Sequence, residues 1–259
     1  MPIFSYFSAM IKIGIIGSGN VASHLSRAFS SAPGLTFTGV YARTPEKLRD
    51  FTDSICNDVN ELDHCDLVIL AVADDAIPDV SAGLPFSGKL VAHTSGSRPL
   101  EDIGPNNRQA SFYPLQTFSR SRTLDYARIP VCIEAHSDQD YEILKIAGSA
   151  FGEVRKIDSA QRRALHLSAV FACNFTNHMY TLAHRLCSDN NVPFSMLHPL
   201  IQETAQKIMS LEPAAAQTGP AVRGDQKTIS THLEMLKDER LRSLYSAISQ
   251  SIGYESKKL

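Results

Sequence analysis

The stretch that decides the fold is IGIIGSGNVA, residues 13–22. Gly17 permits a tight turn after an apolar run, Gly19 lets the backbone approach a ligand, and Ala22 lets a helix pack closely on the preceding strand. A helix that starts at such a turn offers free N–H groups to a diphosphate. The pattern therefore predicts a dinucleotide site, and the alternative is that the glycines serve only the geometry of the turn. The residues expected to hold the diphosphate are Gly17, Ser18, Gly19, Asn20 and Val21.

Short apolar runs alternate with helical stretches over residues 1–157, which is typical of βαβ units. The expected strands are Ile11–Ile16, Leu35–Tyr41, Leu67–Val72, Leu90–His93, Ala110–Tyr113, Ile129–Ile133 and Glu153–Ile157. The run Leu67–Val72 is apolar throughout, as in a parallel sheet covered by helices on both faces. We predict an α/β fold in which residues 1–157 form a Rossmann domain with a doubly wound parallel sheet, residues 1–9 being an extension before it.

Residues 158–259 have a different pattern, which predicts an all-α domain. Proline and glycine are absent from Asp158 to Cys187, and apolar residues recur there at helical spacing. A helical segment of this length is typical of the central helix of an all-helical domain. Further helices are expected near Phe194–Leu211, Gly224–Leu236 and Asp238–Ser251. We expect this second domain to bind substrate and to mediate a homodimer.

The overall composition excludes several classes of protein. The chain has 259 residues, Lys+Arg 25 against Asp+Glu 27 and a net charge of −2, so it lacks the basic surface of a nucleic-acid-binding protein. No apolar run approaches the roughly 18 residues that a membrane span needs. The five cysteines are odd in number and form no CxxC pair, which argues against disulfides and a metal site and favours the cytoplasm.

The end of the second expected strand decides between NAD and NADP. NAD sites usually carry an acidic residue there, which binds the ribose 2′-hydroxyl. This chain has Arg43 and Thr44 instead, and its first carboxylate comes at Glu46. A guanidinium and a hydroxyl suit a 2′-phosphate, and Lys47 adds charge. The sequence therefore predicts NADP; the alternative is a solvated arginine beside a helix cap.

Ligands of doubly wound folds bind at the carboxyl ends of the strands. We expect Ala73 and Asp74, after the third strand, to contact the ribose and diphosphate of the cofactor. The stretch that begins at Thr94, after the next strand, is expected to face the nicotinamide. Asp75 has two equal interpretations, a helix cap and a ligand contact.

Together these motifs resemble a family of NADP oxidoreductases in which a Rossmann-like domain precedes a helical domain of unknown function. The Rossmann half is similar to pyrroline-5-carboxylate reductase and to coenzyme F420-dependent NADP oxidoreductase. The helical half is similar to the C-terminal domain of 6-phosphogluconate dehydrogenase. The segments that carry the resemblance are VYART (40–44), DLVILAVADDAI (66–77), LVAHTSGS (90–97), YPLQTF (113–118), Asn174-Phe175, TGPAVRGD (218–225) and His232-Leu233.

The chain departs from its relatives at two positions. Related β-hydroxyacid dehydrogenases carry a catalytic lysine four residues before an asparagine that Asn174 matches, and here that position is Val170. The YPLQTF segment often begins with His in the family, and here it begins with Tyr113. The proton donor that the resemblance implies is therefore absent from both positions.

Other polar residues are candidates for the missing chemistry. His166, Val170 and Asn174 recur every four residues, so on an α-helix neighbouring members share a face. His166 can donate a proton, and Asn174 can orient a substrate; the alternative is a buried, hydrogen-bonded helix face. Ser95 and Gln116 are expected to assist, or, for Ser95, to cap a loop. Arg223 is expected to bind a substrate carboxylate, or to form an Arg–Asp clamp at a dimer interface.

The sequence thus predicts an NADP-dependent oxidoreductase that transfers hydride between NADPH and a small carbonyl or imine substrate in an interdomain cleft. An imine reductase acting on a proline-like ring is a special case of this hypothesis. The competing hypothesis is a protein that binds NADP(H) without turnover, as a redox sensor or an interaction protein.

Overall fold

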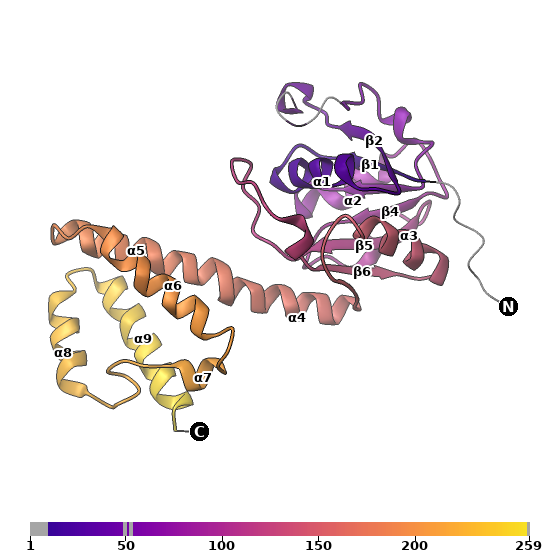
Figure 1. Cartoon of the computed structure of the whole chain (residues 1–259). Helices are drawn as coiled ribbons and strands as arrows, with labels where there is room; N and C mark the ends of the chain where they lie inside the picture. Colours follow the sequence, from indigo (N-terminus) through magenta and orange to yellow (C-terminus); the bar gives the residue numbers. More distant parts are fainter. Residues whose placement is uncertain (1–9, 49–50, 52–53, 258–259) are drawn as a thin grey trace. The chain divides into compact units, whose positions relative to one another are not determined.

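The computed structural model describes residues 10–48, 51 and 54–257, so the expected extension 1–9 lies outside the described residues. The chain divides into two compact units, of which the first ends at Asn177 and the second covers His178–Leu259 (Figure 1). The first unit contains the sheet, and the second is helical. The expected boundary after residue 157 marks the change from strand to helix, whereas the two units divide further along that helical segment.

The first unit is built on a seven-stranded sheet with the order β2-β1-β3-β4-β5-β6-β7. Its strands are β1 (Ile11–Ile16), β2 (Leu35–Tyr41), β3 (Leu67–Leu70), β4 (Leu90–His93), β5 (Arg108–Pro114), β6 (Val131–Ala135) and β7 (Val154–Lys156). The prediction of a Rossmann-type α/β fold is confirmed. Every neighbouring pair is parallel except β5 and β6, which are antiparallel. The sheet is thus mostly parallel, and its one antiparallel pair follows from residues 115–130, which contain no α-helical crossover of the kind that a parallel connection uses.

Helices cover both faces of the sheet. They are α1 (Asn20–Ser31) and α3 (Asp138–Gly148), which pack in one apolar cluster, and α2 (Ile77–Ala82), which packs in another. Alternate residues of β3 enter the two clusters: Ile69 belongs to the first, and Val68 and Leu70 to the second. This arrangement explains why β3 is apolar throughout, as the sequence predicted.

The long helical segment after the sheet is interrupted by a wider turn. It consists of α4 (Ser159–Ala169), a π-helical stretch (Val170–Phe175) and α5 (Thr176–Asp189). The side chain of Thr176 donates to the carbonyl of Phe171, five residues earlier. The expected regular α-helical spacing between His166 and Asn174 is therefore wrong, since π-helical hydrogen bonds change the winding between them.

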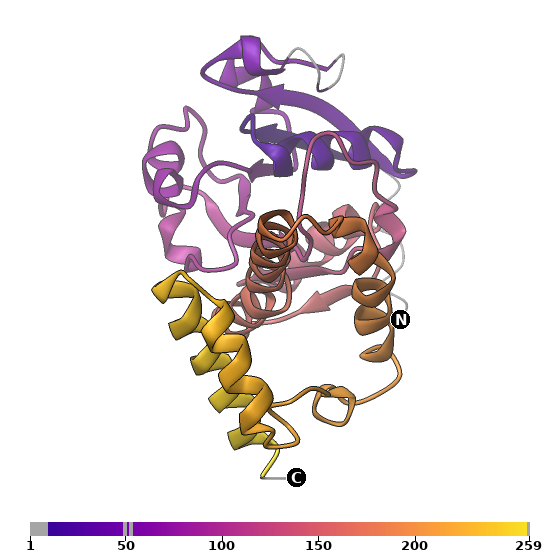
Figure 2. The same ribbon diagram turned by 90° about the vertical axis from the view of Figure 1, so that its left-hand side faces the viewer.

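The described residues of the second unit contain most of α5, from His178 onward, a short 3-10 helix (Phe194–Leu197) and four more α-helices. These are α6 (His198–Lys207), α7 (Pro213–Ala216), α8 (Gln226–Met235) and α9 (Glu239–Glu255). Helices α8 and α9 lie side by side in both views (Figures 1 and 2). Within the described residues, no helix is both long enough and apolar enough to cross a membrane.

Candidate functional site

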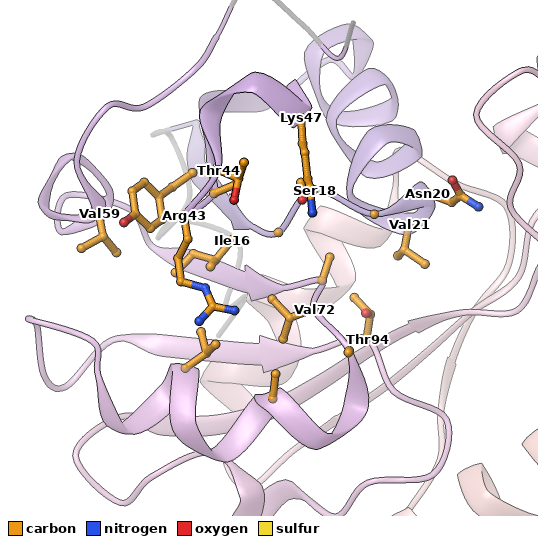
Figure 3. Close-up of a pocket in the computed structure, with 18 of the residues that line it drawn as sticks. Ile16, Ser18, Asn20, Val21, Arg43, Thr44, Lys47, Val59, Val72 and Thr94 are labelled. Carbon is orange, nitrogen blue, oxygen red and sulfur yellow. The ribbon is translucent and has the colours of Figure 1, made fainter. Parts of the chain in front are cut away.

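A cavity of about 780 Å³ opens at the carboxyl ends of β1, β2, β3 and β4 (Figure 3). Because β2 and β3 lie on opposite sides of β1, the strand order reverses at β1, and such a switch point is where doubly wound folds bind ligands. The volume lies within the usual range for small-molecule sites. Each predicted cofactor residue except Asp74 lines the cavity, namely Gly17, Ser18, Gly19, Asn20, Val21, Arg43, Thr44, Ala73 and Thr94.

The two glycines of the turn have different structural roles. Gly17 has φ +142°, and a Cβ added there would lie 2.1 Å from the carbonyl oxygen of Ala71. This position therefore requires glycine for the fold itself. Gly19 has φ −85°, and an added Cβ would meet no heavy atom within 4 Å. Gly19 keeps space free above the turn, which is what close approach of a ligand to the backbone requires.

The start of helix α1 lacks the side-chain groups that usually satisfy its backbone N–H groups. Gly19 is the N-cap, no side chain caps the helix, and the first turn contains no acidic residue. The first N–H groups of a helix have no partner within the helix, so an anion is a suitable acceptor. The uncapped helix, together with the space above Gly19, fits the diphosphate of a dinucleotide.

The loop after β2 brings positive charge to the cavity. Arg43, Thr44 and Lys47 all line it, and Figure 3 shows their side chains extending from this loop. Arg43 and Lys47 are exposed, and neither forms an ion pair with another described residue. Both cations are thus available to an anionic ligand, and the nearby Glu46 does not line the cavity.

An apolar wall, which the sequence reasoning missed, completes this part of the cavity. Val59, Val80 and Leu84 line it from the segments on either side of β3. Apolar walls of this kind suit the flat face of a nucleotide base. These residues carry no local motif, so only the packing of the loop before β3 and of helix α2 brings them together.

The segment after β5 is attached to the glycine turn and to α1. The side-chain amide of Asn20 donates to the carbonyl of Phe118 (3.0 Å), and the Arg120 guanidinium donates to the carbonyl of Ser18. One ring nitrogen of the buried His24 bonds the carbonyl of Ser119 (2.9 Å). Phe118 and Gln116 line the cavity as a result. The sequence indicated Gln116, but it gave no signal for the other contacts because they join residues about a hundred positions apart.

The loop after β4 is held by a network around Asp74. The buried Ser95 hydroxyl donates to Asp74 Oδ2 (2.7 Å) and accepts the N–H groups of Ser97 (3.1 Å) and Arg98 (3.2 Å). Ser97 also donates to Asp74 Oδ2 (2.8 Å). These contacts are the ones that the loop-capping alternative for Ser95 expects. Because its carboxylate is bound to this loop, Asp74 does not line the cavity, whereas its neighbour Ala73 and the nearby Thr94 do.

His166, at the end of α4, packs against the same loop. Its Nδ1 lies 3.1 Å from the hydroxyl of Tyr113 on β5, and the two rings meet edge to face. A Cβ added at Gly96 would come within 2.6 Å of His166 Cγ and Nδ1, so glycine is needed for this contact. Burial raises the pKa of Tyr113 to about 12. The structure thus brings an imidazole and a protonated phenol together beside the ends of β4 and β5.

A buried arginine one turn earlier holds α4 in this position. Arg162 is fully buried, pairs with Glu134 and donates to the carbonyl of Arg98 (2.5 Å). His93 is also buried, and desolvation, followed by the nearby Arg162 charge, lowers its pKa to about 4. The sequence did not indicate this cluster, because charged residues are expected on the surface.

The remaining candidates are Asn174 in the first unit and Arg223 in the second. Asn174 is exposed within the π-helical stretch. Arg223 is exposed in the second unit, and the neighbouring Asp225 caps α8 through its bonds to Thr228. Those bonds, and to a smaller extent Arg223, lower the pKa of Asp225. No cluster of His, Cys, Asp or Glu in the described part of the chain could hold a metal ion.

These features define a class of protein: a Rossmann-type α/β protein with a dinucleotide-binding turn and an appended helical region. Residues 12–95 match the family described as NADP oxidoreductase, coenzyme F420-dependent, and residues 129–252 match a domain of unknown function, DUF2520. A search of curated proteins finds no match.

Solved structures give the particular family. The chain is 40% identical to a protein described as putative NADP oxidoreductase BF3122 from Bacteroides fragilis, with 94% of this chain and 98% of that chain covered and a TM-score of 0.85. It belongs to the family of that protein. Protein TM1727 from Thermotoga maritima shares the fold at 20% identity (TM-score 0.69; 95% and 98% covered). So does a pyrroline carboxylate reductase from Plasmodium falciparum, solved with NADP bound, at 15% identity (0.61; 96% and 97%).

Proposed function

We propose that the cavity binds NADP(H) in preference to NAD(H). The observation that carries this proposal is the pair of exposed cations, Arg43 and Lys47, at the cavity beside an uncapped helix, with no carboxylate at the end of β2. A guanidinium fork binds a phosphate through charge-assisted hydrogen bonds, which contribute about 1.5–3 kcal/mol each.

The preference is tested by titration of Arg43→Ala with each cofactor. Because Arg43 is exposed and its charge is screened by solvent, we expect Arg43→Ala to lose the binding free energy of one such hydrogen bond. This loss corresponds to an affinity for NADPH that is about tenfold weaker. The affinity for NADH should change less than twofold. Arg163→Ala, which removes an exposed arginine on α4 outside the cavity, is the matched control. Equal losses for both cofactors would overturn the proposed role of Arg43.

The reaction that we propose is reduction of a small carbonyl or imine compound, or the reverse oxidation. Bound NADPH supplies the hydride. His166 is the proposed proton donor, through a ring nitrogen. Gln116 lines the cavity, as does Phe118. The Ser95 hydroxyl holds the loop after β4 in place through its bond to Asp74. Asn174 and Arg223 remain candidates for orienting the substrate, Arg223 through a carboxylate. The test is NADPH consumption over a panel of aldehydes, ketones and cyclic imines, with wild type compared with His166→Gln.

The second candidate function is NADP(H) binding without turnover, as in a redox sensor. It is favoured by Val170, which stands where related dehydrogenases carry a catalytic lysine. A sensor binds NADPH and leaves it unoxidised across the whole panel. Turnover that falls in His166→Gln identifies the enzyme instead.

We further propose a homodimer formed through the helical unit. Among the described residues of this unit, Leu236 alone is buried, and large apolar side chains such as Met196, Leu200 and Met209 are exposed. An apolar groove of about 310 Å³ also runs between α5 and α9. A unit of this size needs a buried core, and a second copy of the same chain supplies one. Light scattering should give twice the chain mass of 28.4 kDa, and a monomer mass would refute the dimer.

A further inference from the structure

The hydrogen bond between Tyr113 and His166 determines which ring nitrogen carries the proton. Burial raises the pKa of Tyr113 to about 12, so the phenol is protonated at neutral pH. Its hydroxyl bonds His166 Nδ1 and no other described residue. If Nδ1–H donated to the phenol oxygen, the phenol proton would have no acceptor among the described residues, whereas the reverse arrangement gives it one. The phenol O–H therefore donates to Nδ1, and a neutral imidazole must carry its proton on Nε2.

The surroundings of the ring leave Nε2 accessible. Cγ and Nδ1 face the backbone of Gly96, so Nε2 is at the opposite edge of the ring. His166 is partly exposed, and its Nε2 forms no hydrogen bond with any described residue. Gly96 lies two residues after Thr94, and Tyr113 three residues before Gln116, both of which line the cavity. Neither His166 nor Tyr113 lines the cavity itself, and the pair lies beside the loops after β4 and β5 that contribute Thr94 and Gln116 to it.

Another tyrosine–histidine pair in the same unit shows what a purely structural pair looks like. The Tyr126 hydroxyl lies 3.1 Å from His24 Nδ1, the same separation as in the first pair. The second nitrogen of His24 bonds a backbone carbonyl, and the ring is fully buried. Both nitrogens of His24 are therefore used to attach a loop, whereas His166 keeps one nitrogen available.

We propose that Tyr113 is a positioning residue that fixes His166 as an Nε2–H proton donor and completes a two-proton relay with it. This inference rests on the proposed reductase function. As hydride reaches the carbon of a C=O or C=N bond, the oxygen or nitrogen takes the Nε2 proton of His166. The phenol proton of Tyr113 moves to Nδ1, which keeps the imidazole neutral and leaves a phenolate. Water then returns a proton to Nε2 as the Nδ1 proton goes back to the phenolate oxygen, which restores the phenol and the Nε2–H tautomer. Proton donation to the product is favourable because an alkoxide is a stronger base than a phenolate.

Nitrogen-15 NMR of the histidine rings tests the proposal without a substrate. The His166 signals are identified by their loss in His166→Gln. In the wild-type protein we expect the neutral ring of His166 to be protonated on Nε2. In Tyr113→Phe the fraction of the ring that is protonated on Nδ1 should rise measurably, because the phenol no longer occupies that nitrogen. Tyr126→Phe, which removes the matched bond to His24, should leave the His166 signals unchanged.

A second variant guards against loss of the fold in Tyr113→Phe. Gly96→Ala forces the imidazole away from the loop without altering the phenol, and we expect the same change of tautomer. An Nδ1-protonated ring in the wild type, or the same tautomer in the wild type and both variants, overturns the proposal. Titration of the same samples with NADPH keeps this result separate from the proposed cofactor, since a failure to bind NADPH leaves the NMR result standing.

The pH dependence of turnover supplies the functional test. Without the phenol proton, the ring must donate as imidazolium, whose population falls tenfold for each pH unit on the alkaline side of its titration. Tyr113→Phe should therefore lose turnover tenfold per pH unit in that range, at an almost unchanged KM, while the wild type stays level. The same alkaline decline in both proteins contradicts the relay.

Discussion

Replacement of Gly19 by alanine distinguishes the role of this glycine in folding from its role in ligand binding. The backbone of Gly19 is extended, at φ −85° and ψ −176°, and an added Cβ meets no atom within 4 Å. Alanine gains up to about 1 kcal/mol by restricting the unfolded chain and loses a comparable amount as a poorer N-cap. The free energy of unfolding should therefore change by less than about 1 kcal/mol.

The same methyl group occupies the space that a diphosphate needs to reach the N–H groups of α1. Loss of two such hydrogen bonds at about 1.5 kcal/mol each amounts to about 3 kcal/mol, or about 100-fold in affinity. The assay is NADPH titration followed by cofactor fluorescence, together with urea unfolding of the same variant. Wild-type affinity in Gly19→Ala would refute the assignment of the diphosphate to this turn.

Gly17→Ala is the contrasting variant. Its Cβ would lie 2.1 Å from the Ala71 carbonyl oxygen at a φ of +142°, so the backbone itself must shift. We expect a loss of at least about 2 kcal/mol of stability, of the size that a strained backbone conformation costs. If the free energy of unfolding of Gly17→Ala equalled that of Gly19→Ala, the two glycines would not differ as described.

Two further predictions concern the buried cluster beneath α4. Arg162→Met leaves the Glu134 carboxylate without its cationic partner and should destabilise the protein by about 3–5 kcal/mol in urea unfolding. Arg185→Met, which breaks an exposed pair with Asp238, should cost less than about 1 kcal/mol. His93 has a folded pKa of about 4, below its unfolded value of 6.5, so the unfolded state binds more protons and stability is lost as the pH falls through this window. The loss should total about 3 kcal/mol and be absent in His93→Asn, and equal acid sensitivity of both proteins would contradict it.

Sequence reasoning succeeded where the structure depends on local chemistry. The bounds of β1, β2 and β4 agree with the predicted ranges, because short apolar runs bounded by turn residues determine them locally. Most of the residues that line the cavity follow from the same local motifs. Their carboxyl-end positions meet at one edge of the sheet, as parallel strands require.

The features that sequence reasoning missed depend on contacts between distant residues. The antiparallel β6 follows from a connection that has no helix, and the sequence of residues 115–130 does not show where that connection returns. The π-helical stretch lies in a sequence with ordinary helical periodicity, so its wider turns had no visible signal. Burial of Arg162 depends on Glu134 and on the Arg98 carbonyl, and neither partner is near it in the chain.

The most direct test of the central claim is a titration of the unaltered protein with NADPH and, separately, with NADH. The chain contains no tryptophan, so the fluorescence of the reduced cofactor can be followed with little background. We predict saturable binding of NADPH, and weaker binding of NADH because it lacks the phosphate that Arg43 and Lys47 would contact. Absence of binding to either cofactor would contradict both the oxidoreductase and the sensor.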